Sequence, residues 1–419
     1  MHILFDMTMV LMSPLWTQPS GVDRVVFAHA RHWAALPPSS VTLVARTPQG
    51  QLTALPDQAG RAFIAAAQES IAAGRRGAIP WLRAQAAARM LGHLLGEGRL
   101  RLRRVLEATQ GHGAVLINAS GHMLRAPRAV AEAKGKGARF VPLLHDNLPL
   151  SHPEYSPRNG AAQQKARMAL VSAMADGALA VSAASAQECR RYLAAQGLRV
   201  PRFAVAHPGL DLHTLHAGSP PIRPRPWCVM LSNIAPRKNH LLMLQIWKEA
   251  FAGRPDAPDL VIIGRRGWEN TTTFAMLDRV DWQGRVLELG RLTDAAAVPW
   301  IRGARALLFP SIAEGYGIPL AEALAMGVPV LASDIPAFRE LGAGVPDYLH
   351  PLDGPGWRDA ILAMSAENSP MRAAQLERMQ NWRAPDWSSH FAAVERFLEE
   401  VVSGSQEQAH SAETGQDEH

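Results

Sequence analysis

The chain has 419 residues, of which 47% are hydrophobic and 19% are charged. This composition supplies enough apolar surface for large cores and excludes a wholly disordered chain. At about 100–200 residues per domain, the length predicts two domains. The two cysteines, Cys189 and Cys228, are too few for a disulfide framework or a cysteine-based zinc site, as expected in the cytoplasm. No run of about 18 apolar residues predicts a membrane-spanning helix, and the opening residues MHILFD predict a buried strand rather than a signal peptide.

The formal net charge is +6, from 43 Lys and Arg against 37 Asp and Glu. Residues 403–419 hold four acids and no Lys or Arg, so the rest of the chain carries about +10. A basic balance favours anionic partners such as nucleotides or phospholipid surfaces. The interleaving of aromatic and basic residues that is typical of RNA or single-stranded DNA binding is absent, so nucleic acid is not an expected partner.

Short apolar runs that predict buried strands alternate with longer amphipathic segments. After the first strand, the predicted strands lie at residues 114–120, 140–146, 177–183, 227–233, 259–264, 285–290, 304–310 and 328–333. Fully apolar strands alternating with helices are typical of parallel sheets covered on both faces. The pattern therefore predicts an α/β fold with two doubly wound, Rossmann-like domains.

A proline-rich segment, residues 217–226, interrupts this alternation with four prolines in ten residues. Proline at this density opposes regular structure and stiffens an extended linker. We therefore predict an N-terminal domain over 1–216, a linker over 217–226 and a C-terminal domain over 227–402. The polar residues 403–419 are predicted to be disordered.

Residues 66–107 are rich in arginine, with eight arginines against three acids. The arginines are Arg75, Arg76, Arg83, Arg89, Arg99, Arg101, Arg103 and Arg104. One interpretation is a pair of basic amphipathic helices on an anionic membrane. The other is a pair of solvated helices packed on the first domain.

The segment LFPSIAEGYGIPLAE, residues 308–322, contains the densest chemical signal. A strand ends before a turn that contains Gly315 and Gly317, where the backbone can approach a ligand closely. A helix is predicted to begin near Pro319, because proline is favoured at the first helical position. The N–H groups of Leu320 and Ala321 would then point toward an anion at the positive end of the helix dipole.

Two carboxylates, Glu314 and Glu322, flank this predicted anion site. Carboxylates would repel a phosphate, but they accept hydrogen bonds strongly from the hydroxyl groups of sugars. The alternative is that Glu322 merely complements the helix N-terminus.

A second loop, residues 232–240, joins a strand to a helix and carries Arg237 and Lys238. Two adjacent cations can bind a diphosphate without a metal ion. Both loops are predicted to open at the carboxyl edge of one parallel sheet, where such sheets bind ligands.

These motifs resemble those of the group 1 (family 4) retaining glycosyltransferases, which have the two-domain GT-B fold. The quoted landmarks are SGVDRV (20–25), LLHDNLPLSHPEY (143–155), AVSAAS (180–185), HPGLD (207–211), NIAPRKNH (233–240), VIIGRRGW (261–268), ELGRLTD (288–294) and EGYGIPLAE (314–322). They occur in the family's order, and the resemblance covers roughly residues 1–400.

The resemblance implies roles for individual residues. Glu314 would contact the donor sugar and Glu322 the ribose of its nucleotide, while Arg237 and Lys238 would hold the diphosphate. His145 would lie near the reacting sugar, although it could instead be a histidine that caps a strand. The donor would also be lined by the Gly21 loop and by the backbone of Gly315, Tyr316, Gly317 and Ile318.

The resemblance further implies a retaining transfer of a hexose, with a lean toward mannose, from a nucleotide diphosphate sugar to a glycan or lipid-linked acceptor in polysaccharide biosynthesis. The donor would bind the C-terminal domain and the acceptor the N-terminal one, and the C-terminal helix would pack back on the N-terminal domain. The enzyme would be cytoplasmic and peripheral on the inner face of the plasma membrane. A sugar-nucleotide epimerase of the same fold and a non-catalytic sugar-nucleotide-binding protein are the alternatives.

The sequence also predicts that no metal cofactor is needed. None of its seventeen aspartates lies two positions from another, so the Asp-x-Asp motif that holds a divalent ion in many sugar-nucleotide transferases is missing. Neither the glycine fingerprint of a dinucleotide-binding first strand nor the P-loop motif of a nucleoside triphosphatase is present.

Overall fold

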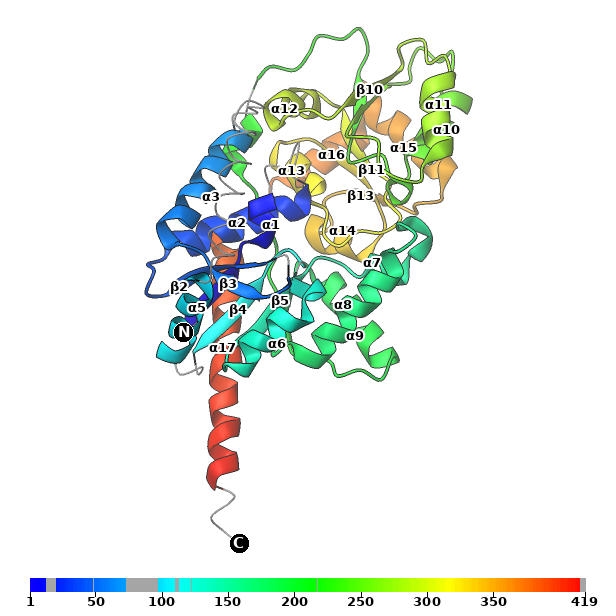
Figure 1. The fold of residues 1–419 in the computed structure, drawn as a ribbon. Helices are drawn as coiled ribbons and strands as arrows, with labels where there is room; N and C mark the ends of the chain where they lie inside the picture. The colour runs from blue at the N-terminus through cyan, green and yellow to red at the C-terminus, as the bar shows by residue number, and fades with distance from the viewer. Residues whose placement is uncertain are drawn as a thin grey trace.

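A computed structural model describes residues 1–12, 20–47, 49–72, 97–109, 113–121, 123–216 and 218–414. These residues form two α/β domains, one blue to green and the other green to orange in Figure 1. Each domain is built on a mainly parallel sheet, so the predicted fold class is confirmed.

In the first domain, the described residues form a seven-stranded sheet in the order β3-β2-β1-β4-β5-β6-β7. The strands are β1 (His2–Asp6), β2 (Val41–Arg46), β3 (Leu52–Ala54), β4 (Ala114–Asn118), β5 (Arg139–Leu144), β6 (Ala178–Ala180) and β7 (Phe203–Val205). The helices are α1 (Thr8–Met12), α2 (Gly21–Ala35), α3 (Asp57–Ala72), α5 (Glu97–Ala108), α6 (Pro127–Gly135), α7 (Leu148–Ser151), α8 (Gly160–Met174) and α9 (Ala183–Ala195). Among the described strands of this sheet, only the pairing of β2 with β3 is antiparallel. The central strands β1 and β4 are buried along their whole length, which explains their unbroken apolar sequences.

In the second domain, the described residues form a six-stranded parallel sheet in the order β10-β9-β8-β11-β12-β13. The strands are β8 (Trp227–Leu231), β9 (Asp259–Ile263), β10 (Val286–Gly290), β11 (Ala306–Phe309), β12 (Val330–Ser333) and β13 (Asp347–Leu349). The helices are α10 (His240–Glu249), α11 (Thr271–Arg279), α12 (Asp294–Arg302), α13 (Ile318–Ala325), α14 (Pro336–Gly342), α15 (Gly354–Ser365) and α16 (Pro370–Met379). Residues 218–226, all of them described, contain neither helix nor strand, as their prolines predicted.

The last helix, α17 (Trp387–Thr414), returns to the first domain and packs on β5 and β7. Gly177 makes this contact possible, because a β-carbon there would lie 2.7 Å from the ring of Phe397. The two chain segments that join the domains also touch, since the N–H of Leu210 donates to the carbonyl of Pro385 at 3.1 Å. The predicted return of the C-terminal helix is therefore confirmed (Figure 1).

The structure differs from the prediction in the polar tail. Helix α17 continues through residues 403–414 instead of ending near residue 402, and residues 415–419 lie outside the described part. Glutamine, glutamate and alanine propagate an existing helix readily, because the unfavourable nucleation step has already occurred.

A hydrogen-bonded row of side chains fastens α17 to α2. The indole N–H of Trp33 donates to Nδ1 of His29 at 3.3 Å, and the Nε2 atoms of His29 and His390 lie 2.9 Å apart. Nδ1 of His390 lies 3.1 Å from the carbonyl oxygen of His207. A carbonyl oxygen can only accept, so His390 must donate through Nδ1. Nδ1 of His29 accepts from Trp33, so His29 carries its proton on Nε2 and donates it to Nε2 of His390. Both rings are therefore neutral, and each has one defined tautomer.

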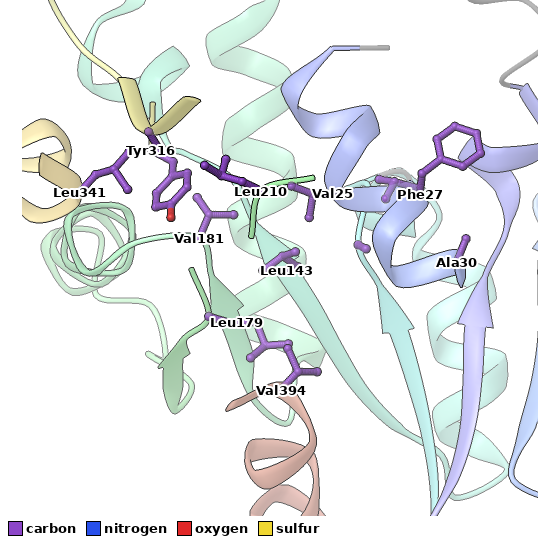
Figure 2. Close-up of a cluster of buried hydrophobic side chains, with 14 of the residues drawn as sticks. Val25, Phe27, Ala30, Leu143, Leu179, Val181, Leu210, Tyr316, Leu341 and Val394 are labelled. Atoms are coloured by element: carbon purple, nitrogen blue, oxygen red, sulfur yellow. The ribbon is translucent and has the colours of Figure 1, made fainter. Parts of the chain in front are cut away.

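One hydrophobic cluster extends through both domains. Figure 2 shows Tyr316 and Leu341 of the second domain beside Val181 and Leu210 of the first, with Val394 of α17 close to the first sheet. Apolar burial across the boundary stabilises the observed arrangement of the two domains.

The arginine-rich region is only partly described. Helix α5 carries Arg99, Arg101, Arg103 and Arg104 on its exposed surface, whereas Arg75, Arg76, Arg83 and Arg89 lie outside the described residues. Leu100 of the same helix is 58% exposed, and Leu102 and Leu106 are buried. In the described part of the chain, no helix combines the length and apolar character needed to cross a bilayer.

Candidate functional site

Three predicted site residues meet at the carboxyl edge of the second sheet. Strands β8 and β11 are neighbours, so the loops that follow them lie side by side, and the N–H of Ile312 donates to the carbonyl of Arg237 at 2.8 Å. Nη1 of Arg237 lies 2.6 Å from Oε2 of Glu314, and Nζ of Lys238 donates to Oε1 of the same carboxylate. The side chain of Glu314 is only 8% exposed. The structure therefore brings these three side chains together in one buried cluster.

The charges of this cluster are strongly coupled. Burial alone would raise the pKa of Glu314, but Arg237 and Lys238 outweigh it and lower that pKa to about 2. Burial, together with the nearby charge of Arg237, lowers the pKa of Lys238 to about 8 against the opposing effect of Glu314. At neutral pH the cluster holds one negative and two positive charges, and it therefore offers a net positive charge to an anion.

The turn at Gly315 is fitted against the first domain. Its carbonyl oxygen accepts hydrogen bonds from the hydroxyl groups of Ser182 at 2.6 Å and Ser185 at 2.9 Å. A β-carbon on Gly315 would lie 2.2 Å from the carbonyl oxygen of His145, which is far inside van der Waals contact. Glycine is therefore required here by the close approach of another backbone segment, whereas the sequence predicted the close approach of a ligand.

The side chain of Tyr316 points away from the charged cluster. Its hydroxyl donates to the carbonyl of Pro208 at 3.0 Å, and its ring stacks on that of His207 with centroids 5.8 Å apart. The side chain of Tyr316 is thus part of the core between the domains. Only its backbone could contact a nucleotide-sugar donor.

The structure corrects one part of the predicted anion site. Gly317 has a φ of 114°, which glycine adopts readily, and α13 begins directly after it at Ile318. The N–H of Leu320 donates to the carbonyl of Gly317 at 2.9 Å, so it is not free to bind an anion. The helix closes its own first turn, which sequence spacing could not reveal. Ala321 lies buried in the same turn.

Glu322 forms an ion pair with a residue that was not among the predicted site residues. Nη1 of Arg24, on α2, donates to Oε1 of Glu322 at 2.5 Å, and Nη2 donates to Asp294 at 2.7 Å. The only available signal was the position of Arg24 within the SGVDRV landmark. Gly21, three residues earlier, lies against Ile318, since its β-carbon would be 3.4 Å from Cδ1 of that side chain. The predicted Gly21 loop therefore does face the second domain.

His145 follows β5 at the carboxyl edge of the first sheet. Its Nε2 lies 2.8 Å from the carbonyl oxygen of Ala119, which places the proton of the neutral ring on Nε2. Burial lowers the pKa of His145 against the opposing effects of that hydrogen bond and of Asp146 and Asp23. A neutral ring at this edge fits both interpretations made from the sequence, a strand-capping histidine and a residue beside the reacting sugar.

Among the described residues, no group of three or more His, Cys, Asp or Glu side chains is arranged to hold a metal ion. Both cysteines are buried free thiols.

The facing pair of Rossmann-like domains defines a GT-B fold. A structure of HepE (Alr3699) from Anabaena in complex with UDP aligns with 95% of this chain and 100% of its own, with a TM-score of 0.61 at 15% identity. A complex of the same protein with UDP-glucose aligns with a TM-score of 0.59. At this level of identity the comparison establishes the fold alone.

The sequence comparisons show similarity to glycosyltransferases over parts of the chain. Residues 225–367 match the family described as "Glycosyl transferases group 1". The serotype-specific mannosyltransferase WbdA of Escherichia coli is 29% identical over 278 residues, which are 62% of this chain and 33% of WbdA. A phosphatidyl-myo-inositol mannosyltransferase of Mycolicibacterium smegmatis is 32% identical over 173 residues, which are 41% of this chain and 43% of that protein. The chain thus spans about a third of the WbdA proteins and less than half of the mycobacterial relative. The matched part of the second domain is therefore similar to the group 1 glycosyltransferases.

Proposed function

We propose that the protein is a retaining hexosyltransferase that moves a sugar from a nucleotide diphosphate donor to a glycan or lipid-linked acceptor in polysaccharide or glycolipid biosynthesis. The observation that carries the proposal is the buried cluster of Glu314, Arg237 and Lys238 at the domain boundary. The printed names of the WbdA and mycobacterial relatives, all mannosyltransferases, support mannose as the sugar.

The charges of the cluster suit the departure of a diphosphate. Negative charge grows on the diphosphate as the glycosidic bond breaks, and fixed cations stabilise it without reorganisation. Arg237 and Lys238 supply those cations, and a bound diphosphate would raise the pKa of Lys238 from about 8 and keep it protonated. Glu314 would then be free to exchange part of its ion pairing for hydroxyl groups of the donor sugar.

Retention requires attack on the face from which the diphosphate leaves. We infer that the donor phosphate assists the incoming acceptor hydroxyl, with His145 beside the reacting carbon and the neighbouring domain excluding water. We also infer that the cations make a divalent metal unnecessary, because charge-assisted hydrogen bonds contribute about 1.5–3 kcal/mol each.

Two measurements test the proposal. In a thermal-shift panel of UDP-, GDP- and ADP-sugars, a donor present at about 100 times its Kd should stabilise the protein by about 2.7 kcal/mol. Proton NMR of the early product should then show the donor's anomeric configuration retained on the acceptor. Conversion of the donor without any acceptor would instead indicate an epimerase, and binding without turnover a non-catalytic protein.

We further propose that the protein binds anionic membrane surfaces through α5. Arg103 is 67% exposed and Arg99 is 53% exposed on that helix, and Leu100 lies between them in sequence. Basic side chains beside an apolar one suit the headgroup region of a bilayer.

Liposome sedimentation tests this membrane contact. Replacing Arg103 and Arg104 with glutamine should reduce binding to anionic vesicles and leave the weak binding to neutral vesicles unchanged. The same replacement of Arg190 and Arg191, which are exposed on α9, provides a matched control. Equal binding to both vesicle types, or no loss at high salt, would reject the proposal, because surface charges are screened over about 8 Å at physiological ionic strength.

A further inference from the structure

Arg24 connects the two domains by giving one nitrogen to each of two carboxylates. It extends from the first turn of α2 in the first domain to Glu322 on α13 and Asp294 on α12 in the second. The side chain of Glu322 is 10% exposed, whereas that of Asp294 is 52% exposed. The guanidinium group therefore spans from the buried carboxylate to the protein surface.

Because Arg24 gives only one of its nitrogens to Glu322, the ion pair engages one of the two carboxylate oxygens. The ion pair uses Oε1, and among the residues that the structure describes Oε2 accepts no hydrogen bond. A fork-to-fork pair would instead have occupied both oxygens. The observed geometry fixes the orientation of the carboxylate and leaves Oε2 without a partner among the described residues.

Arg24 also determines the charge of Glu322. Burial raises the pKa of Glu322, and so do the nearby carboxylates of Asp294 and Asp211, while Arg24 lowers it by charge and by its hydrogen bond. Asp211 is itself paired with Arg31 at 3.1 Å. Without Arg24, burial and the two nearby carboxylates would favour the protonated acid, whose capacity to accept hydrogen bonds is smaller.

We propose that Arg24 is a positioning residue for the donor nucleotide, which holds Glu322 ionised and oriented so that Oε2 accepts a ribose hydroxyl. This inference rests on the proposed function, in which Glu322 contacts the ribose. It adds that a side chain of the first domain controls ribose recognition in the second, so the donor site is complete only when the domains are together.

The test is calorimetric titration of the full chain with GDP-mannose and UDP-glucose between pH 5 and 8. The diphosphate of a nucleotide sugar is a diester and keeps its charge over this range, so a loss of affinity on the acid side reports the protein. In Arg24→Gln, this loss should begin about one pH unit higher than in the wild type. At the pH where the wild type has lost half of its affinity, the variant should bind about fivefold more weakly than the wild type. Arg24→Lys keeps the positive charge, so its pH dependence should lie close to that of the wild type.

A second variant should move the pH at which affinity is lost in the opposite direction. Asp294→Asn removes a carboxylate that disfavours ionisation of Glu322, so the loss of affinity should move to lower pH. An Arg24→Gln variant that binds the donor as well as the wild type, or that is weaker by one constant factor at every pH, would overturn the proposal.

Glu322→Gln separates this inference from the proposed function. If that variant keeps full donor affinity, Glu322 does not contact the ribose and the donor-site assignment itself fails. If it loses affinity while Arg24→Gln retains the wild-type pH dependence, only the role of Arg24 is wrong.

Discussion

Acidification should loosen the attachment of α17 by protonating the histidines that fasten it to α2. His390 is 1% exposed, and burial lowers its pKa from 6.5 to about 4, against hydrogen bonds to the backbone of His207 and Ala206 that raise it. The pKa of His29 is also lowered by burial. Protonation of His390 at Nε2 would remove the acceptor that His29 uses, so the charged form and the observed row of hydrogen bonds cannot coexist.

The size of the effect follows from linkage. A histidine with a lowered pKa in the folded state binds its proton more readily when unfolded, so stability is complete above about pH 6.5 and falls until about pH 4. For a pKa of 6.5 unfolded and about 4 folded, the loss at pH 5 is about 2 kcal/mol. The full loss below pH 4 is about 3 kcal/mol.

Urea unfolding at pH 7.5 and pH 5, followed by tryptophan fluorescence, measures this loss. Trp33 donates to His29 and Trp387 packs on His390 with ring centroids 5.2 Å apart, so both indoles report the relevant contact. His390→Gln should reduce the acid-induced loss by about 2 kcal/mol, whereas His350→Gln, at an exposed histidine, should not. An acid-induced loss of the same size in His390→Gln and the wild type would refute the reasoning.

Three further predictions concern the candidate active site. Glu314→Ala should lower kcat/KM by at least about 100-fold because the donor sugar loses a partner, and a normal turnover rate in a steady-state assay would contradict the donor-site assignment. Gly315→Ala should separate the domains, because its β-carbon would lie 2.2 Å from the carbonyl oxygen of His145; we expect a larger radius of gyration in solution scattering and about 100-fold slower transfer, and an unchanged radius would be evidence against a tight boundary. Transfer should continue at its normal rate after EDTA treatment, and a loss that magnesium or manganese alone restores would show that the cations do not suffice.

The sequence predicted the apolar strands near the centre of each sheet because such strands are specified locally, but it did not predict β2, β3, β7 or β13. A run such as that at residues 259–264 is buried on both faces of a parallel sheet, and its apolar character is visible without knowledge of its neighbours. The cluster of Glu314, Arg237 and Lys238 was predictable for a related reason, since loops that follow adjacent parallel strands open at the same edge.

Features that depend on contacts between the domains were not predictable. Arg24 looked like one more basic residue near a helix start, and its partner Glu322 is 298 positions away. The sequence showed that Tyr316 lies in a glycine-rich turn, but the side chain is drawn toward Pro208 on the other domain. The length of α17 was underestimated for a different reason, because polar residues continue a helix that packing has already started.

The return of α17 also determines how this protein could be recombined with its relatives. Residues 387–402 follow the second domain in the sequence but cover β5 and β7 of the first, with Phe397 and Val401 against Gly177. A hybrid made by exchanging everything after residue 226 would therefore set a foreign helix on the first sheet. The side chains of that helix would have to pack closely against Gly177, as Phe397 does in this protein. A functional exchange of the donor-binding half should instead use two junctions, one in residues 218–226 and one between α16 and α17, so that each sheet keeps its own cover.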